Sequence, residues 1–90
     1  MMTMQLSEAA RVLDGHCRDG DVMFRGVSTD SRRLRAGNLF VALQGPNFDG
    51  HDYLDMALAQ GAAAAAVNRS VDCDLPLLEV GDTRLALGRL

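Results

Sequence analysis

The clearest feature of the hydrophobic pattern is a continuous apolar segment within residues 38–44. Apolar residues at successive positions are typical of a strand covered on both faces, as in a mostly parallel sheet. Two further apolar segments follow, the alanine-rich residues 62–67 and residues 75–80, where Pro76 stands at the start of the expected strand. Alanine favours helix by propensity, but residues 62–67 follow Gly61 and lead into polar residues, so we predict a buried strand there.

Three segments have the pattern of helices. The first begins with Ser7 as N-cap and ends at Gly15, a typical C-terminal stop. The second covers about residues 51–60 and ends at Gly61; its predicted buried face is Tyr53, Met56, Ala57 and Leu58.

Asp82 is expected to cap the last helix, which carries Leu85, Ala86 and Leu90. That helix reaches the end of the sequence without a C-cap, so we expect a fragment or a domain boundary there. Between the first helix and residue 28, a turn at Asp19–Asp21 predicts two short strands, residues 16–18 and 22–27. The strand-helix-strand-helix order of the second half predicts one small α/β domain, a mixed, mostly parallel sheet with helices packed on it.

Composition and charge narrow the function classes. The chain has 90 residues, 48% of them apolar, and a net charge of −3, which argues against a nucleic-acid-binding module. All nine basic residues are arginines, so a phosphate-loop lysine, a Schiff-base lysine and a lysine general base are excluded. The N-terminus lacks the basic region of a signal peptide, and the longest apolar run is too short to cross a bilayer. We therefore expect a cytoplasmic chain with no membrane insertion.

Metal and catalytic patterns are absent from the sequence. Cys17 and Cys73 lie far apart, and His16 and His51 do not complete a zinc-ligand spacing with them, so we predict two free thiols and no metal site. No glycine-rich phosphate loop occurs, and no spacing supports a Ser/His/Asp triad. We accordingly assign no catalytic residues and expect a binding domain.

Two polar stretches, residues 28–32 and 45–51, flank the apolar strand and carry the candidate binding groups. Arg32 and its neighbours Arg33 and Arg35 form a positive spot suited to phosphate, and Thr29 and Ser31 offer hydroxyl groups. In the second stretch, the amide of Asn47 can read a pyrimidine edge and Phe48 can stack on a ring. His51 falls near a helix start, where free backbone N–H groups favour anions.

Each of these residues also has a purely structural interpretation. The arginines fit a solvated turn, and Asp30 can cap that turn and pair with Arg32. Phe48 fits a core position, and His51 fits a capping or surface histidine. Taken singly, none of these residues establishes a function.

Taken together, the stretches resemble a known family. The segments 27–32 (VSTDSR), 36–45 (AGNLFVALQG), 48–53 (FDGHDY) and 80–88 (VGDTRLALG) resemble the N-terminal domain of the Mur ligases, the ATP-dependent enzymes that build the peptidoglycan precursor. The resemblance spans nearly the whole chain. Segments 4–10, 20–22 and 82–86 look more like the member that adds D-Ala-D-Ala to UDP-MurNAc-tripeptide than the member that adds the third peptide residue to UDP-MurNAc-L-Ala-D-Glu.

The resemblance implies that residues 1–90 hold the UDP end of a UDP-MurNAc-peptide, while central and C-terminal domains, absent here, bind ATP, magnesium and the amino compound. Thr29 and Ser31 match motif residues that contact uridine diphosphate, and Pro46, Asn47 and Phe48 match a loop against the uracil. Asp30, Arg32 and His51 are further candidates. The resemblance implies an ATP-dependent ligase as the parent, with this fragment alone inactive and without a cofactor of its own. A stand-alone small-ligand or interaction module of the same fold is the alternative.

Overall fold

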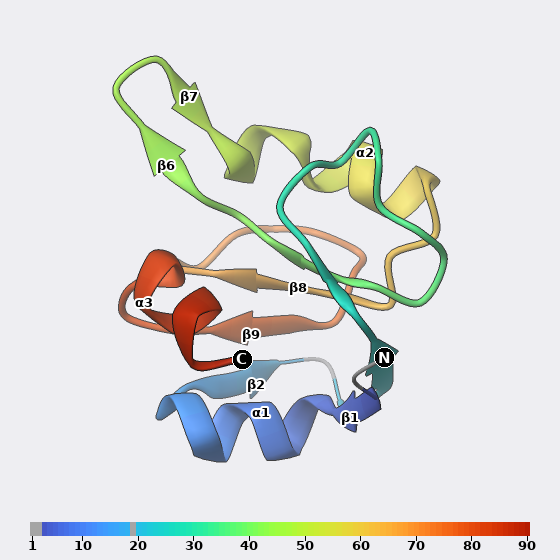
Figure 1. Cartoon of the computed structure of the whole chain (residues 1–90), viewed down its shortest axis with the longest axis vertical. Coiled ribbons are helices and arrows are strands. Elements are labelled where there is room, and N and C mark those ends of the chain that lie inside the picture. The colour runs from blue at the N-terminus through green and yellow to red at the C-terminus, as the bar shows by residue number, and fades with distance from the viewer. Residues whose placement is uncertain (1–2, 19) are drawn as a thin grey trace.

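A five-stranded sheet forms the centre of the computed structural model, which describes residues 3–18 and 20–90 (Figure 1). The strand order is β2–β9–β8–β5–β4. β2 runs antiparallel to β9, whereas the pairs β9–β8, β8–β5 and β5–β4 are parallel. The bounds of these strands are His16–Arg18 (β2), Leu77–Glu79 (β9), Ala64–Val67 (β8), Leu39–Val41 (β5) and Val27–Ser28 (β4). The predicted α/β class with a mixed, mostly parallel sheet is confirmed.

Helices cover both faces of this sheet. Figure 1 shows α1 (Leu6–Leu13) and α2 (Leu54–Ala59) on opposite sides of it. α3 (Thr83–Arg89) contacts α1 and contributes Ala86 to the same core cluster as α1. α2 is preceded by the 3-10 helix η1 (Gly50–Tyr53) and contributes Leu54 and Ala57 to the cluster on the other face. Along the described residues 3–18 and 20–90, no helix has the length and apolar character needed to span a membrane.

Strand β5, between β8 and β4, contributes to both clusters. Leu39 and Val41 pack with α1, while Phe40 and Ala42 pack with α2, and each of them is at most 1% exposed. Alternate side chains of a strand point to opposite faces, so a continuous apolar run is what a doubly covered strand requires. The prediction for this segment is confirmed.

The alanine-rich segment is also a strand, as predicted against helix propensity. All four residues of β8 are fully buried between β5 and β9. Gly61 ends α2 with a φ of 96°, a backbone conformation that glycine adopts without steric cost. Tertiary burial of the alanines therefore outweighs their intrinsic preference for helix.

Two short strands do form in residues 16–27, as predicted, but they belong to different sheets. β2 coincides with the predicted strand 16–18 and pairs with β9, whereas β3 (Met23–Arg25) pairs antiparallel with β1 (Thr3–Gln5). The expected strand 22–27 is interrupted at Gly26, whose φ is 72°. Each strand finds a partner far away in sequence, which local turn signals cannot indicate. Asp19 of the predicted turn, like Met1 and Met2, lies outside the described residues.

The N-cap predicted for α1 is also wrong. The helix begins at Leu6, and Ser7 lies inside its first turn. The Ser7 backbone N–H and hydroxyl both donate to the Asp21 carboxylate, at 2.9 and 2.8 Å. The N-terminal N–H groups of the helix thus find an acceptor from a later segment rather than from a local cap. At the other end, Asp14 takes the left-handed conformation immediately before Gly15, with a φ of 54°.

The buried face of α2 differs in part from the prediction. Ala57 is buried as predicted, together with Leu54, whereas Tyr53, Met56 and Leu58 are exposed. The 3-10 turn before α2 has about three residues per turn, so it shifts the phase of the apolar stripe. The predicted cap of α3 is confirmed, because the Asp82 carboxylate accepts from the backbone N–H groups of Arg84 and Leu85. Of the apolar residues of that helix, Ala86 is buried and Leu85 is 56% exposed.

A small hairpin extends from the sheet. It consists of β6 (Gln44–Gly45) and β7 (Phe48–Asp49), which pair antiparallel, and it projects away from the rest of the molecule (Figure 1). We refer to residues 44–49 as the hairpin. Its second strand, β7, leads directly into η1.

Candidate functional site

A cavity of about 400 Å³ opens at the carboxyl end of β4 and beside the hairpin. Open α/β sheets bind ligands outside the carboxyl ends of their parallel strands, so the position is a usual one for a binding site. The lining residues come from the loop after β4, from β5, from β7 and from η1; they are Thr29, Asp30, Ser31, Arg32, Phe40, Phe48 and Tyr53. The structure thus brings both polar stretches of the sequence to one cavity.

One wall of the cavity is residues 28–34, which we call the Asp30 turn. Asp30 Oδ1 accepts from the Arg32 backbone N–H at 2.9 Å, and the Asp30 carbonyl accepts from the N–H groups of Arg33 and Leu34. The Ser28 hydroxyl oxygen accepts from the Asp30 N–H at 3.2 Å. The capping interpretation of Asp30 is therefore confirmed.

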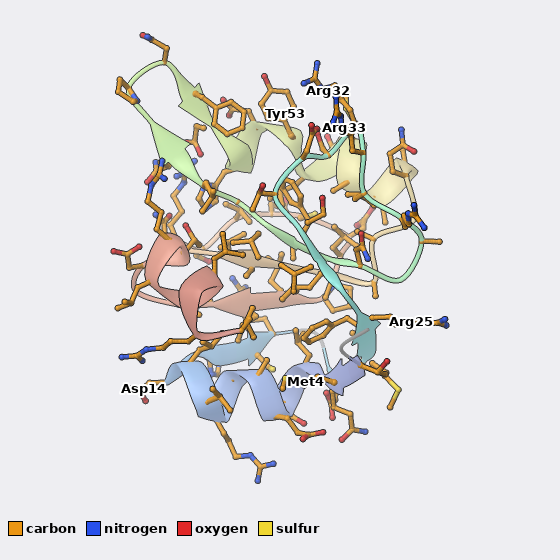
Figure 2. The ribbon with its side chains drawn as sticks, viewed as in Figure 1. Met4, Asp14, Arg25, Arg32, Arg33 and Tyr53 are labelled. Atoms are coloured by element: carbon orange, nitrogen blue, oxygen red, sulfur yellow. The ribbon has the colours of Figure 1, made fainter. Side chains whose placement is uncertain are left out.

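Ion pairing in the Asp30 turn takes place on its exposed side. The Asp30 carboxylate lies 3.5 Å from Arg32 Nε and 3.8 Å from Arg33 Nε. The Arg32 backbone N–H, with the nearby guanidinium groups, holds the pKa of Asp30 below its usual range even though partial desolvation opposes it. Figure 2 shows Arg32 and Arg33 side by side at the same end of the molecule as Tyr53. The rim of the cavity therefore carries positive charge that a carboxylate already partly neutralises.

The two hydroxyl candidates differ in exposure. Ser31 is 6% exposed, and its hydroxyl donates to the Met56 sulfur at 3.4 Å. Thr29 is half-buried and lines the cavity beside it. A hydroxyl bonded to a thioether has a weak partner, so the Ser31 hydroxyl can exchange this contact for a stronger acceptor.

A second part of the lining, which we call the aromatic wall, consists of Phe48 and Tyr53. Phe48 and Tyr53 stack with their ring centroids 5.4 Å apart and an interplanar angle of 18°. They are 46% and 38% exposed, so Phe48 is not a core residue. The sequence pattern indicates Phe48 as a ligand candidate but predicts Tyr53 on the buried face of a helix. The two rings are five residues apart, with the end of β7 and a 3-10 turn between them. A separation of five residues across such a junction does not by itself predict that two side chains stack, so the sequence pattern does not indicate the pair.

Pro46 and Asn47 lie away from the cavity lining. They form the two-residue turn between β6 and β7, and both are exposed. The hairpin therefore presents Phe48, which directly follows the turn, to the cavity and the two turn residues to solvent. The cavity itself is lined without them.

A polar network holds the base of the hairpin. The Asp49 carboxylate accepts from the His51 backbone N–H at 3.0 Å, from Arg69 at 2.9 Å and from the Gln44 amide at 3.3 Å. The Gln44 side chain in turn accepts from the Asn68 amide at 2.9 Å. We call Gln44, Asp49, His51, Asn68 and Arg69 the hairpin network. Burial would raise the pKa of Asp49, but the bonds from His51, Arg69 and Gln44 outweigh it and hold that pKa far below its usual range.

His51 belongs to this network rather than to the cavity. Its Nε2 lies 3.1 Å from the Asn68 backbone N–H and must accept from it, so Nδ1 carries the proton donated to Asp49 Oδ1 at 2.7 Å. The residue is 7% exposed, and both of its ring nitrogens are engaged. The arrangement makes His51 a structural link between the hairpin and the segment after β8.

Metal-binding clusters are not found in the described part of the chain. No group of three or more His, Cys, Asp or Glu side chains in residues 3–18 and 20–90 is arranged to hold a metal ion. Cys17 and Cys73 are both free and partly buried. The chemistry that the cavity offers is therefore recognition by hydroxyl, guanidinium, backbone N–H and aromatic groups.

Comparison with known proteins identifies relatives of this chain. Residues 23–90 match the family described as Mur ligase family, catalytic domain. The UDP-N-acetylmuramoyl-tripeptide--D-alanyl-D-alanine ligase of Escherichia coli is 48% identical over 90 residues, which is 100% of this chain and 20% of that protein. The UDP-N-acetylmuramoyl-L-alanyl-D-glutamate--2,6-diaminopimelate ligase of Geobacter sulfurreducens is 38% identical over 91 residues, covering 97% of this chain and 18% of that protein.

Solved structures of such ligases also match this chain. A UDP-N-acetylmuramoylalanyl-D-glutamyl-2,6-diaminopimelate--D-alanyl-D-alanyl ligase from Acinetobacter baumannii matches 100% of this chain and 21% of its own, with a TM-score of 0.89 and 31% identity. The MurF ligase of Thermotoga maritima, solved in complex with ADP, matches 70% of this chain and 15% of its own, with a TM-score of 0.64 and 35% identity. The chain thus spans about a fifth of the length of the relatives it matches.

Proposed function

The chain belongs to the Mur ligase family and is homologous to the N-terminal domain of MurF, and we propose that it binds the uridine diphosphate end of UDP-MurNAc-tripeptide. The main support for the proposal is the cavity, whose lining combines Arg32 and the hydroxyl groups of Thr29 and Ser31 from the loop after β4 with aromatic rings from β7 and η1. Its volume of about 400 Å³ lies in the range of small-molecule sites. A nucleoside diphosphate has the matching chemistry, a flat ring at one end and an anion at the other.

Each cavity residue has a role in the proposal. Arg32 and the hydroxyls of Thr29 and Ser31 bind the diphosphate, since guanidinium and hydroxyl donors are its natural partners. Phe48 lies against the base. Pro46 and Asn47, at the exposed tip of the hairpin next to Phe48, approach the uracil from outside the cavity lining. Asp30 and His51 support the two walls.

The parent protein in this proposal is an ATP-dependent ligase of cytoplasmic peptidoglycan-precursor synthesis that adds D-Ala-D-Ala to the tripeptide. We prefer the member that uses the tripeptide over the member that uses the dipeptide. The sequence identity of this chain to the Escherichia coli ligase of the first type is 48%, and its identity to the Geobacter sulfurreducens ligase of the second type is 38%. The residues of this chain do not fit an ATP site, since it contains no lysine and no glycine-rich phosphate loop. We therefore assign ATP and magnesium to the central domain of the parent, and we expect this chain alone to be inactive.

The proposal is tested by titrating the 90-residue chain with UDP-MurNAc-tripeptide, UDP and UMP while following backbone amide chemical shifts. We expect the shifts to cluster at residues 28–33 and 45–51, with larger changes for UDP than for UMP. ADP at equal concentration is the control for base preference. An absence of shifts at these residues with millimolar UDP would overturn the proposal and favour an interaction module of the same fold.

A matched pair of variants tests the hydroxyl contact. Replacing Ser31 by Ala should weaken UDP binding about fivefold or more if the hydroxyl contacts the diphosphate. Replacing Ser70 by Ala, an exposed serine whose hydroxyl accepts from Arg18 at 2.6 Å, should leave UDP binding unchanged. Equal affinities for the two variants would contradict the assignment of Ser31.

A further inference from the structure

We infer that Tyr53, stacked on Phe48, is the base-stacking residue that gives the cavity its preference for a flat nucleobase. The inference rests on the proposed function and adds to it a residue that the sequence analysis assigned to the core. Tyr53 comes from η1, and Phe48 comes from β7. The aromatic wall is therefore built where two segments meet.

The geometry of the pair suits a third ring. The two rings are close to parallel, with an interplanar angle of 18° and centroids 5.4 Å apart, and both line the cavity. Near-parallel rings present their flat faces in one direction, whereas an edge-to-face pair would present an edge. A planar ligand ring can continue the stack, as bases do on the aromatic platforms of nucleotide-binding proteins.

Both rings of the pair are partly exposed to solvent, so a ligand can cover them. The described part of the chain places Phe40 in its core at 1% exposure, yet Phe48 and Tyr53 remain 46% and 38% exposed. Leaving large aromatic surface in water costs free energy that burial would recover. A ligand ring covers this surface, and the cavity places it there without any rearrangement of the fold.

The aromatic pair is not required to hold the hairpin in place. The hairpin network already attaches Asp49 to His51 and Arg69 and attaches Gln44 to Asn68. Arg84 adds a bond from its guanidinium to the Gln44 carbonyl at 2.7 Å. Because polar contacts position the hairpin independently, the exposed rings are free to serve the cavity.

The polar part of the lining sets the direction of the ligand. Arg32 and Thr29 line the same cavity as the rings but come from the loop after β4, so a ligand that binds its anion there can direct its ring toward Tyr53. A nucleoside diphosphate fits both ends, while inorganic diphosphate fits the polar end alone. The two ligands therefore separate the contribution of the aromatic wall from that of the polar wall.

Tyr53 is itself a spectroscopic reporter. The chain contains a single tyrosine and no tryptophan, so its tyrosine fluorescence comes from Tyr53 alone. Titration of the 90-residue chain with UDP should quench this fluorescence to saturation, because a base stacks on the ring. Inorganic diphosphate should leave the emission unchanged. N-acetyltyrosinamide, titrated in parallel, corrects for light absorbed by the uracil.

Variants give the second measurement. We expect Tyr53→Phe to bind UDP within about twofold of the original chain, since the ring is kept, and Tyr53→Leu to bind about tenfold more weakly. Both variants should bind inorganic diphosphate as the original chain does. Leu58→Ala is the matched control, because Leu58 is similarly exposed, at 40%, on the adjoining helix and lies outside the cavity lining. Affinities come from amide-shift titrations, and thermal unfolding confirms that each variant is folded.

The outcomes distinguish this inference from the proposed function. If UDP shifts residues 28–33 but leaves Tyr53 emission unchanged, or if Tyr53→Leu binds UDP as tightly as Tyr53→Phe, the inference is overturned and the proposed function stands. If UDP produces neither shifts nor quenching, the proposed function fails and the inference fails with it. Quenching by UDP together with the tenfold difference between the two variants supports both.

Discussion

The two walls of the cavity are held by interactions of very different range. In the Asp30 turn, the bonds of Asp30 join residues no more than four positions apart, such as Arg32 and Leu34, and the one distant bond described above is the weak contact of Ser31 with Met56. At the hairpin, the contacts of Asp49 with Arg69, of Gln44 with Asn68 and of Arg84 with Gln44 join residues 20, 24 and 40 positions apart. One wall is a local turn, and the other depends on the complete fold.

This difference bears on how the site responds to change. A local turn keeps most of its own bonds when other parts of the molecule are perturbed, because its donors and acceptors are neighbours in the chain. The hairpin keeps its position only while β8, α3 and η1 are in place, since these elements adjoin its partners. Substitutions at the hairpin should therefore cost more stability than substitutions in the Asp30 turn.

Gly50→Ala should cause the largest loss of stability. A Cβ at this position would lie 2.8 Å from the Leu43 nitrogen and 2.9 Å from the Ala42 Cα, which are backbone atoms that cannot move aside. We expect the free energy of unfolding to fall by about 2–4 kcal/mol, measured by urea denaturation. Gly81→Ala is the control, because its Cβ would meet nothing within 4 Å. Equal stability of the two variants would contradict the close packing of the hairpin base.

Asp49→Ala should cause the second-largest loss of stability. The substitution removes the acceptor of the buried His51 Nδ1–H and of Arg69, and an unsatisfied buried donor lowers the free energy of unfolding by about 2 kcal/mol. Asp30→Ala should lower the free energy of unfolding clearly less, because the ion pairs of Asp30 are local and exposed. Urea denaturation of both variants measures the comparison. A larger loss for Asp30→Ala than for Asp49→Ala would reverse the ranking of the two walls.

The pH dependence of stability should come in part from Asp49. Its folded-state pKa lies below the unfolded value of about 3.9, so its ionised form stabilises the fold above that pH and the contribution is lost as pH falls. The stability difference between the original chain and Asp49→Asn should therefore shrink from about pH 5 to pH 3. Asp30 and Asp21 are present in both proteins, so their own titrations cancel. A difference that stays constant over this range would show that the charge of Asp49 is irrelevant.

Ser28→Ala should have the smallest effect. The Ser28 hydroxyl accepts from the Asp30 N–H at 3.2 Å and donates to the Asp30 carbonyl at 3.1 Å, within a turn that other bonds also hold. We expect a loss of about 0.5–1 kcal/mol in the free energy of unfolding. Hydrogen exchange of the hairpin amides should remain unchanged. Faster exchange at residues 44–49 would show that the two walls are coupled.

Parts of the site could be predicted wherever the relevant partners are close in sequence. The capping role of Asp30 and that of Asp82 follow from an acidic side chain and backbone N–H groups two or three positions later. The structure brings the candidates Thr29, Ser31 and Phe48, from the two stretches around one strand, to the same cavity. Tyr53 was missed because its orientation depends on a 3-10 turn whose phase the apolar pattern does not reveal.

The errors in the fold have the same origin. The sequence placed strands near residues 16–18 and 22–27, but pairing of β2 with β9 and of β3 with β1 required partners from distant segments. The α1 N-terminus is similar, since its acceptor is Asp21, 14 positions from Ser7. Pairing energies are alike for local and distant strands of similar pattern, so the pattern alone does not choose among them.

By itself, the sequence determined the α/β class, the doubly covered strand β5, the buried alanine strand β8 and the cap of α3. These features depend on side-chain period, burial preference and bonds that span a few residues. The tertiary structure decided which strands pair, where Tyr53 points and how the hairpin network surrounds Asp49. Those outcomes depend on contacts that form only once distant segments have been brought together, and the fold as a whole supplies the free energy for closing these long loops.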